Sequence, residues 1–445
     1  MNPQANRSGT LRPTKPRLSA LRTAGLIVVA LAGVARADGP GIKLGDTLVL
    51  HPSIYVGAGY DNNVLYGSNT PNVDPTLSSA YVATRPGIEL ATRSLLGAGT
   101  DPRTADFRLT VGLPLRFFAT SDKAINGHYS VGVDAGLALA VFPLGNWTFE
   151  LFDNFIRTSD PPYAVVAALF TLDQGGNINR DLNTGGVRLR WRPGGRRFET
   201  AVQYTNGVDY FESQALIDKR LVTHDFNLRF KWNFFPKTAL YINGSETLVR
   251  YMNQGVGNTP PDGYPLRVIA GLIGLITAKF RVDANIGYGN SFTQSNAAYP
   301  NNNSFSSVVA SVDLNWAPVT TTQIGVTYKH DFMQALVGTY YTLDVANLRF
   351  AQKIWRFNLG LSGGYEHRIY NGSLAADGLK DGRIDNLVNG HIQLDLPIKD
   401  WLMVSVGDDV QKLWSNCQFL VQGLHGSPSC DYLRNDLWLR LNVAY

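Results

Sequence analysis

The segment HDFNLRFKWNFF, residues 224–235, alternates between apolar and polar side chains. Its apolar positions are Phe226, Leu228, Phe230, Trp232 and Phe234, and between them lie Asn227, Arg229, Lys231 and Asn233. Successive side chains of a β-strand point to opposite faces, so the pattern predicts a strand with one apolar and one polar face. The segment is about twice as long as the roughly 5–6 residues of a strand in a soluble protein.

The same alternation recurs along the chain after residue 47. We count eighteen such segments, near 48–65, 80–93, 105–120, 127–142, 146–158, 180–192, 197–212, 222–235, 238–251, 266–277, 279–292, 304–317, 320–333, 339–351, 354–370, 383–397, 400–414 and 431–445. A tilted strand needs about 9–11 residues to cross a bilayer, and these segments are long enough. Charged residues make up 17% of the chain, below the roughly 25% of a soluble domain. We therefore expect an all-β fold, a transmembrane antiparallel up-and-down barrel of about 18 strands.

The connections between the segments alternate between short and long. Tight turns are expected at 143–146, 192–197, 235–237, 317–320 and 397–400, and longer polar loops at 66–79, 159–179, 252–265, 293–303, 371–382 and 415–430. Outer-membrane barrels have short periplasmic turns and longer extracellular loops. Tryptophans stand near the short turns, at Trp147, Trp191, Trp232, Trp316, Trp355 and Trp401. This placement favours a girdle at the lipid headgroups, with ordinary core packing as the alternative for any single one.

The first 37 residues differ from the rest of the chain. They contain six basic residues and no acidic one, an apolar run at 24–35, and small residues at Ala35 and Ala37. This layout predicts a secretory signal peptide cleaved after Ala37. An uncleaved anchor is less favoured, because a membrane span needs about 20 residues. The expected organisation is a cleaved Sec signal at 1–37, a short periplasmic segment at 38–47 and a single outer-membrane barrel at 48–445.

The net charge of +5 comes from that leader. Without its six basic residues, 40 − 6 = 34 basic residues stand against 35 acidic ones. A strongly basic chain would suggest binding to nucleic acid. Because the remainder of the chain is close to neutral, we expect no nucleic-acid partner.

A barrel of about 16–18 strands leaves a water-filled interior, which the polar faces of the strands should line. The residues expected on this lining carry both signs: Arg188, Arg190, Arg192, Arg229, Lys231, Glu89, Asp134 and Glu366. Two interpretations stay open. A wet lumen tolerates charges of either sign and pairs many of them. Alternatively, the arginines form a basic ladder that guides an anionic or hydroxyl-rich solute, because Arg donates bidentate hydrogen bonds to carboxylates and phosphates.

The loop from Ser159 to Arg180 contains an apolar run at 164–172, which is unusual for a solvated loop. We expect this run to pack against the barrel wall. If the loop folds inward, its residues Pro161, Pro162, Tyr163 and Phe170 would narrow the pore. The alternative is a loop packed on the extracellular rim.

Few residues suggest chemistry. The seven histidines are scattered, and the sequence has no H-E-x-x-H motif, no Cys/His cluster for zinc and no G-x-S-x-G elbow. His224 and His330 share the apolar faces of their segments, where interfacial polar residues are expected rather than a lipase-like site. We therefore expect no enzyme activity, no cofactor and no metal. In an exported chain, Cys417 and Cys430 should form a disulfide; two free thiols are the alternative.

The chain ends on another alternating stretch, DLWLRLNVAY, residues 436–445. We expect a closing strand there that pairs with the first strand near 50–60 and presents Leu437, Leu439, Leu441 and Val443 to lipid. The terminal aromatic Tyr445 resembles the signal that the outer-membrane insertion machinery reads. A soluble edge strand would instead expose this apolar row as an aggregation hazard.

Three stretches resemble elements of a known family. YVGAGYDNNVLYGSN at 55–69 and YVATRPGIELATRS at 81–94 are similar to elements of the outer-membrane porin family called beta-barrel porin 2, and ELFDNFIRTSDPP at 150–162 looks like a later element. Members of that family occur with capsule and exopolysaccharide export systems. The resemblance implies an eighteen-stranded barrel like the myxobacterial exopolysaccharide-export porins. It also implies a periplasmic polysaccharide export protein as partner, a polysaccharide substrate and no catalytic motif.

Together these features predict a multi-pass protein in the outer membrane of a Gram-negative bacterium, in contact with lipid. The leading expectation is a channel that secretes a capsule or exopolysaccharide. One alternative is a general or solute-specific diffusion porin. Another is an outer-membrane enzyme or a structural barrel with a closed lumen.

Overall fold

A computed structural model describes residues 39–68, 76–92, 104–122, 125, 130–159, 179–255, 257–300, 304–372, 382–417 and 429–445. The expected signal peptide at 1–37 lies outside these residues. Among the described residues, no helix is long and apolar enough to cross a bilayer. The strands all belong to one hydrogen-bonded sheet with antiparallel neighbours.

The wall of the sheet contains eighteen strands, sixteen of them continuous. The continuous strands are β2 (Leu48–Asp61), β3 (Ser79–Thr92), β8 (Trp147–Thr158), β9 (Arg180–Trp191), β10 (Phe198–Phe211), β11 (Leu221–Phe235), β12 (Thr238–Tyr251), β13 (Leu266–Thr277), β14 (Phe280–Asn290), β15 (Ser306–Trp316), β16 (Thr322–Gln334), β17 (Tyr340–Ile354), β18 (Phe357–Asn371), β19 (Ile384–Lys399), β20 (Leu402–Ser415) and β21 (Tyr432–Ala444). A short β1 (Ile42–Leu44) folds back onto β2. Two short 3₁₀ helices, η1 (Gly194–Arg196) and η2 (Gln214–Lys219), lie in connections.

Two neighbouring wall strands are interrupted at the same height along the barrel wall. The third consists of β4 (Ala105–Gly112) and β5 (Leu115–Phe118), and the fourth of β6 (Ser130–Val131) and β7 (Val133–Val141). Pro114 lies in the first break and has no N–H to donate to a ladder. Its carbonyl instead accepts a hydrogen bond from Gly132 in the second break, at 2.7 Å. A Cβ at Gly132 would lie 2.7 Å from the Pro114 ring, so the close approach requires glycine.

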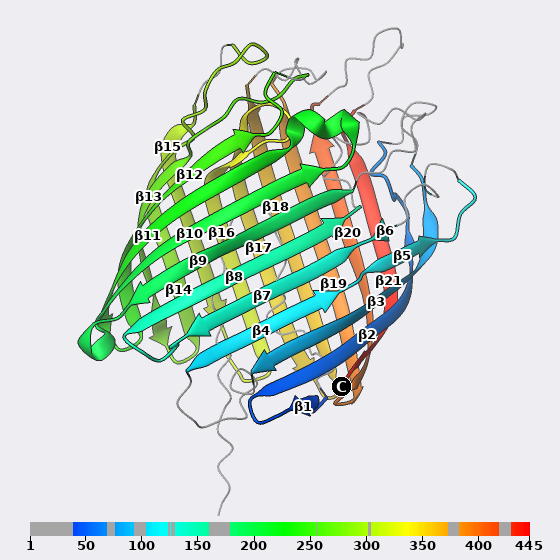
Figure 1. Ribbon diagram of the computed structural model, residues 1–445. Helices are drawn as coiled ribbons and strands as arrows, with labels where there is room; N and C mark the ends of the chain where they lie inside the picture. The colour runs from blue at the N-terminus through cyan, green and yellow to red at the C-terminus, as the bar shows by residue number, and fades with distance from the viewer. Residues whose placement is uncertain are drawn as a thin grey trace, which may run out of the picture. The chain divides into compact units, whose positions relative to one another are not determined.

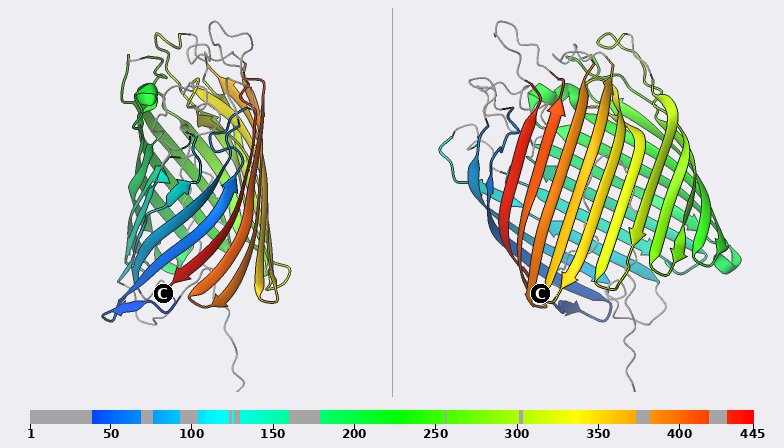
Figure 2. Two further views of the ribbon diagram at one scale, coloured as in Figure 1. Left: turned by 90° about the vertical axis from the view of Figure 1, so that its right-hand side faces the viewer. Right: turned by 180° about the vertical axis from the view of Figure 1, so that it is seen from behind.

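The sheet closes on itself between its first and last long strands. β21 pairs with β2 from Ser53↔Ala444 to Asp61↔Asp436, and every wall strand pairs with its neighbours in the chain. Closure joins the two outer edges of the sheet, so the backbone groups along the paired ladders are satisfied internally. Figures 1 and 2 show the strands running obliquely around this wall. The predicted antiparallel barrel is confirmed, and each of the eighteen predicted segments corresponds to a wall strand.

The two faces of the wall differ in polarity as the alternation predicts. On β21, Leu437 and Leu439 point outward and are each 54% exposed, while Trp438 between them points inward and is buried. Outward Ile54 of β2 lies opposite Val443. Phe234 of β11 was predicted to end the outward apolar row of that strand. A bulge between Trp232 and Phe235 shifts the register, so Phe235 is exposed on the outer face in its place.

Connections of two kinds lie at opposite ends of the barrel (Figure 1). The short turns after β7, β9, β11, β13, β15, β17 and β19 share one end with the C-terminus, and we call it the turn end. The other end, which contains η2, is the loop end. Each predicted turn position falls at the turn end. Trp355 and Arg356 form the turn between β17 and β18, so the strand predicted at 354–370 begins at Phe357 instead.

Exposed aromatic side chains form a row near each end. The six tryptophans beside the short turns, Trp147, Trp191, Trp232, Trp316, Trp355 and Trp401, are between 40% and 78% exposed. A second row near the loop end contains Tyr60, Tyr288, Tyr328, Tyr365 and Trp414. Aliphatic outward residues fill the space between the rows, as on a lipid-facing surface bounded by two headgroup layers.

Candidate solute pathway through the barrel

The inner wall of β9 is basic towards the turn end. Val187, Leu189 and Trp191 point outward, so Arg188 and Arg190 point inward. Both guanidinium groups reach Glu150 on β8, with Arg188 Nη1 at 3.1 Å and Arg190 Nη2 at 2.5 Å from its carboxylate oxygens. Arg188 Nε also donates to the Gln203 side chain on β10 at 2.7 Å. One carboxylate thus serves two arginines.

Arg192 follows directly after β9 and has no carboxylate partner among the described residues. Its Nη2 donates to the Thr148 hydroxyl at 2.5 Å and to the Pro143 carbonyl at 3.1 Å. Partial burial lowers the pKa of Arg192 from its ordinary value, and the nearby charge of Arg190 adds to this effect. The ordinary pKa of arginine is so high that the side chain stays a cation at neutral pH.

Arg229 and Lys231 continue the basic surface on the inner face of β11. The Arg229 guanidinium lies over the Tyr241 ring, 4.0 Å from its centroid, and its buried Nε has no hydrogen-bond partner among the described residues. Neither side chain lies within ion-pair distance of a carboxylate in the described part of the chain. Both therefore present charge to the interior.

The charges on this part of the wall do not balance. Towards the turn end, the inner faces of β8–β11 and the residue after β9 contribute Arg188, Arg190, Arg192, Arg229 and Lys231 against Glu150 and Glu199, a difference of 5 − 2 = +3. Arg190 and Glu199 approach to 4.0 Å. We call these seven residues the basic wall. A negatively charged solute could bind here to cationic hydrogen-bond donors that no carboxylate neutralises.

Elsewhere the predicted lumen charges are paired. Glu89 of β3 lies 3.1 Å from Arg108 on β4, and Asp134 of β7 accepts two hydrogen bonds from Arg85 on β3. Glu366 pairs with Arg368 two residues along β18, and both side chains are buried. On β3–β7 and β18 the charges of the lumen pair with one another, as the first interpretation expects. On β8–β11 an excess of basic side chains remains, as the basic ladder of the second interpretation requires.

A packed apolar cluster lies inside the loop end of the barrel. It contains inward-facing Leu387 of β19, Leu413 of β20 and Tyr432 of β21, together with Val337, Tyr66 and the two cysteines. Val337 and Tyr66 come from the connections after β16 and β2, which therefore fold onto the inner wall. From the sequence, an inward fold was expected only for the loop at 159–180. Pro161, Pro162, Tyr163 and Phe170 of that loop lie outside the described residues.

The stretch GYDNN at 59–63 joins the first strand to the last. Asp61 pairs with Arg434 of β21 at 2.6 Å, and Arg434 also donates to the Tyr66 hydroxyl. The Asn63 side chain donates to the carbonyls of Gly67 at 2.8 Å and Leu433 at 3.0 Å. Asp61 and Asn63, which belong to the stretch quoted above at 55–69, thus connect the two strands at the seam where the barrel closes.

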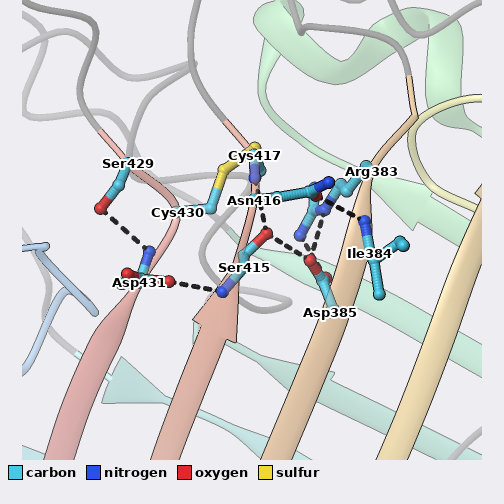
Figure 3. The surroundings of a disulfide bond; sticks show 9 residues. All are labelled: Arg383, Ile384, Asp385, Ser415, Asn416, Cys417, Ser429, Cys430 and Asp431. Carbon is cyan, nitrogen blue, oxygen red and sulfur yellow. Dashed lines mark hydrogen bonds and ion pairs between the residues drawn. A yellow bond between two sulfur atoms is a disulfide. The ribbon is translucent and has the colours of Figure 1, made fainter.

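Cys417 and Cys430 form a disulfide at the loop end of β20 and β21 (Figure 3). Below it, the Ser415 hydroxyl donates to Asp385 on β19 and accepts a hydrogen bond from the Cys417 N–H at 3.0 Å. Asp385 also pairs with the buried Arg383 at 2.6 Å. The disulfide is thus connected, through the Cys417 N–H, to a hydrogen-bonded network that joins β19 and β20.

The two histidines considered for a lipase-like site lie near the loop end on the outer surface. His224 Nδ1 is 2.8 Å from the Tyr204 hydroxyl, and His330 Nδ1 is 2.8 Å from Asp344. The described residues contain no group of three His, Cys, Asp or Glu side chains that could hold a metal ion. Leu437, Leu439, Leu441 and Val443 lie on the outer face of the closing strand, and the Tyr445 N–H donates to the Pro52 carbonyl at 3.0 Å.

Several solved structures of outer-membrane proteins match this chain at low identity. OpdK of Pseudomonas aeruginosa, crystallised with vanillate, is 11% identical, with 89% of this chain and 99% of that chain covered and a TM-score of 0.44. A mutant of the ferric enterobactin receptor PfeA of Pseudomonas aeruginosa is 10% identical, with 89% and 80% covered and a TM-score of 0.43. The siderophore receptor PirA of Acinetobacter baumannii is 8% identical, with 89% and 80% covered and a TM-score of 0.45.

Neither a family nor a substrate follows from these similarities. No family model matches the chain. No curated protein matches it either. The chain itself forms a closed barrel with an apolar outer face, an unbalanced basic wall and a partly filled loop end.

Proposed function

We propose that this protein is a diffusion channel of the Gram-negative outer membrane that favours small anionic solutes. The observation that carries the proposal is the unbalanced charge of the basic wall, where Arg229 and Lys231 have no carboxylate partner among the described residues. Fixed charges that line a pore select ions of the opposite sign. A barrel of about this strand number is also wide enough to leave an aqueous interior.

The outer surface supports a membrane location. Exposed leucine, isoleucine and valine side chains lie between the two aromatic rows, as at Leu348, Leu439 and Val56. Lipid accepts such a surface, whereas water would promote its aggregation. In this orientation the turn end faces the periplasm and the loop end faces the cell exterior.

Secretion of a polysaccharide with a periplasmic export protein was the leading expectation from the family resemblance. Sugar rings would stack on exposed aromatic faces along the lumen. Inward-facing Tyr81 and Trp438 are each only 3% exposed and are covered by their neighbours. These two residues give polymer export no specific support. Polymer trapped inside cells that lack the protein would nevertheless favour export over diffusion.

Liposome swelling tests the proposed function. Vesicles that contain the full-length protein should swell faster in an anionic solute than in a cationic one of the same size. The preference should weaken in Arg229→Gln/Lys231→Gln. It should remain in Lys353→Gln/Arg356→Gln, which removes two exposed charges at the turn end. Equal swelling rates in both solutes would contradict anion preference, and folded protein that causes no swelling would contradict the channel itself.

A further inference from the structure

The ladder between β15 and β16 stops before either strand ends. Their pairing runs from Trp316↔Ile324 to Ala310↔His330. Beyond this point β15 stays paired with β14 up to Ser306↔Asn290, and β16 stays paired with β17 up to Gln334↔Tyr340. The tip of the β16–β17 hairpin, residues 331–340, therefore separates from its neighbour in the wall. We call this segment the hairpin tip.

Polar contacts place the hairpin tip against the inner faces of more distant strands. Arg267, which points inward from β13, donates from Nε to Asp331 Oδ1 at 2.8 Å and from Nη2 to the Phe332 carbonyl at 2.6 Å. Gln334 Nε2 donates to the hydroxyl of inward-facing Tyr251 on β12 at 2.7 Å. β14 and β15 separate β13 from β16 in the wall. These contacts therefore form across the inner surface of the barrel.

An apolar cluster fills the space between the hairpin tip and the wall. Phe332 stacks on Phe305 with ring centroids 4.5 Å apart, and the cluster also contains Val309 and Tyr340. Phe332 continues the row of Tyr328, which faces outward, yet Phe332 is only 2% exposed. In the part of β16 nearer the turn end, this row of side chains faces lipid. In the hairpin tip the same row faces the inner surface of the wall. The hairpin tip therefore forms a second layer inside the barrel.

Gly289 on the inner face of β14 makes room for this second layer. A Cβ at this position would lie 2.9 Å from Phe332 Cε1 and 2.7 Å from Val309 Cγ1. Contacts this short would displace the ring of Phe332 or the strand that carries it. The absence of a side chain at Gly289 is therefore part of how the hairpin tip fits.

The far end of the hairpin tip reaches the inner wall at the seam side. Val337 is 1% exposed and belongs to the apolar cluster with Leu387, Leu413 and Tyr432 of β19–β21. The Thr339 N–H donates to the Asn371 carbonyl at the end of β18, at 3.0 Å. The hairpin tip thus contacts β12–β14 at one end and belongs to the β19–β21 cluster at the other. It crosses part of the lumen at the loop end.

We propose that the hairpin tip is the constriction that limits the size of solutes in this channel, and that Arg267 is the positioning residue that holds it. The proposal rests on the channel function proposed above and adds the element that sets its size limit. Asp331 is 6% exposed, and Lys329 approaches it at 2.8 Å beside Arg267. Arg267 alone bridges this carboxylate to the wall at β13, because Lys329 belongs to β16 itself.

Single-channel conductance of the full-length protein in planar bilayers tests the proposal. Replacing residues 335–339 with two glycines should raise the conductance about twofold and admit larger solutes, because less of the cross-section is filled. Arg267→Met should raise the conductance in the same direction. Arg349→Met is the matched control: it also removes an inward arginine, which pairs with Asp313 at 3.0 Å and does not contact the hairpin tip.

The outcomes separate the two proposals. If wild type conducts and the shortened variant has the same conductance, the constriction is overturned and the channel stands. If neither protein conducts, the channel function fails and the constriction fails with it. Gln334→Cys/Tyr251→Cys provides a test that does not depend on conductance. A bis-maleimide reagent, whose length replaces the lost Gln and Tyr side chains, should cross-link the folded variant, seen as a mobility shift on a gel, and absence of the cross-link would contradict the placement of the hairpin tip.

Discussion

Asp61, at the loop end of the first long strand, forms an ion pair of 2.6 Å with Arg434 of the last strand, and Asp61 is fully buried. The pair lies at the seam, where β2 and β21 join residues from opposite ends of the chain. Its partners Tyr66 and Asn63 bring the connection after β2 into the same network. Closure of the barrel and the inward fold of this connection are therefore coupled through one carboxylate.

Arg434→Met should destabilise the barrel strongly, because it leaves a buried carboxylate without its partner. The expected loss is about 3–5 kcal/mol. Urea unfolding in detergent, followed by tryptophan fluorescence, measures it. Asp61→Asn/Arg434→Met removes both charges and should be more stable than the single variant. If Arg434→Met unfolds at the same urea concentration as wild type, the seam does not depend on this pair.

The opposite polarity of neighbouring residues is testable on β17. Leu348 is 55% exposed on the outer face, and Asn347 beside it points inward. Leu348→Arg places a charge in lipid and should cost about 2–4 kcal/mol near the bilayer midplane. Asn347→Arg adds the same charge to the lumen and should cost much less. The free energy of unfolding is measured for both variants in lipid vesicles. If Leu348→Arg and Asn347→Arg lose the same amount, the assignment of Leu348 to the lipid face and Asn347 to the lumen is wrong.

One residue added after Tyr445 should impair assembly of the barrel. The Tyr445 N–H donates to the Pro52 carbonyl, and the Ala444 carbonyl accepts from Gly39, so the backbone of residues 444–445 is hydrogen-bonded at the seam. The fraction of folded protein in outer-membrane extracts, resolved by gel mobility before and after heating, measures assembly. An insertion beside Gly194, which lies in open space in a turn, is the control. Wild-type levels of the extended protein would refute a C-terminal assembly signal.

The alternation of single segments was sufficient to predict the wall. Leu437, Leu439 and Leu441 face outward as their period-2 spacing requires, and the same rule placed Arg188 and Arg190 inside. This works because each strand is long and the two faces contact different solvents. The spacing also predicted the turns at 143–146 and 192–197.

Features that depend on pairing between strands were not predictable from a single sequence. β16 keeps its alternation past His330, so nothing in its own residues marks where the ladder to β15 stops. Phe332 resembles another lipid-facing residue, and only the contacts from Arg267 show its inward position. The same limit applies to charge. The unpaired state of Arg229 depends on the carboxylates of neighbouring strands, which the alternation of β11 does not reveal.

We expect the lumen of this barrel to conduct ions and to favour anions because of the basic wall. The reversal potential of the purified protein in a planar bilayer under a potassium chloride gradient tests it most directly. We predict a reversal potential with the sign for chloride preference, shifted towards zero in Arg229→Gln/Lys231→Gln and unchanged in Lys353→Gln/Arg356→Gln. A reversal potential with the sign for potassium preference in the wild-type protein would contradict the account.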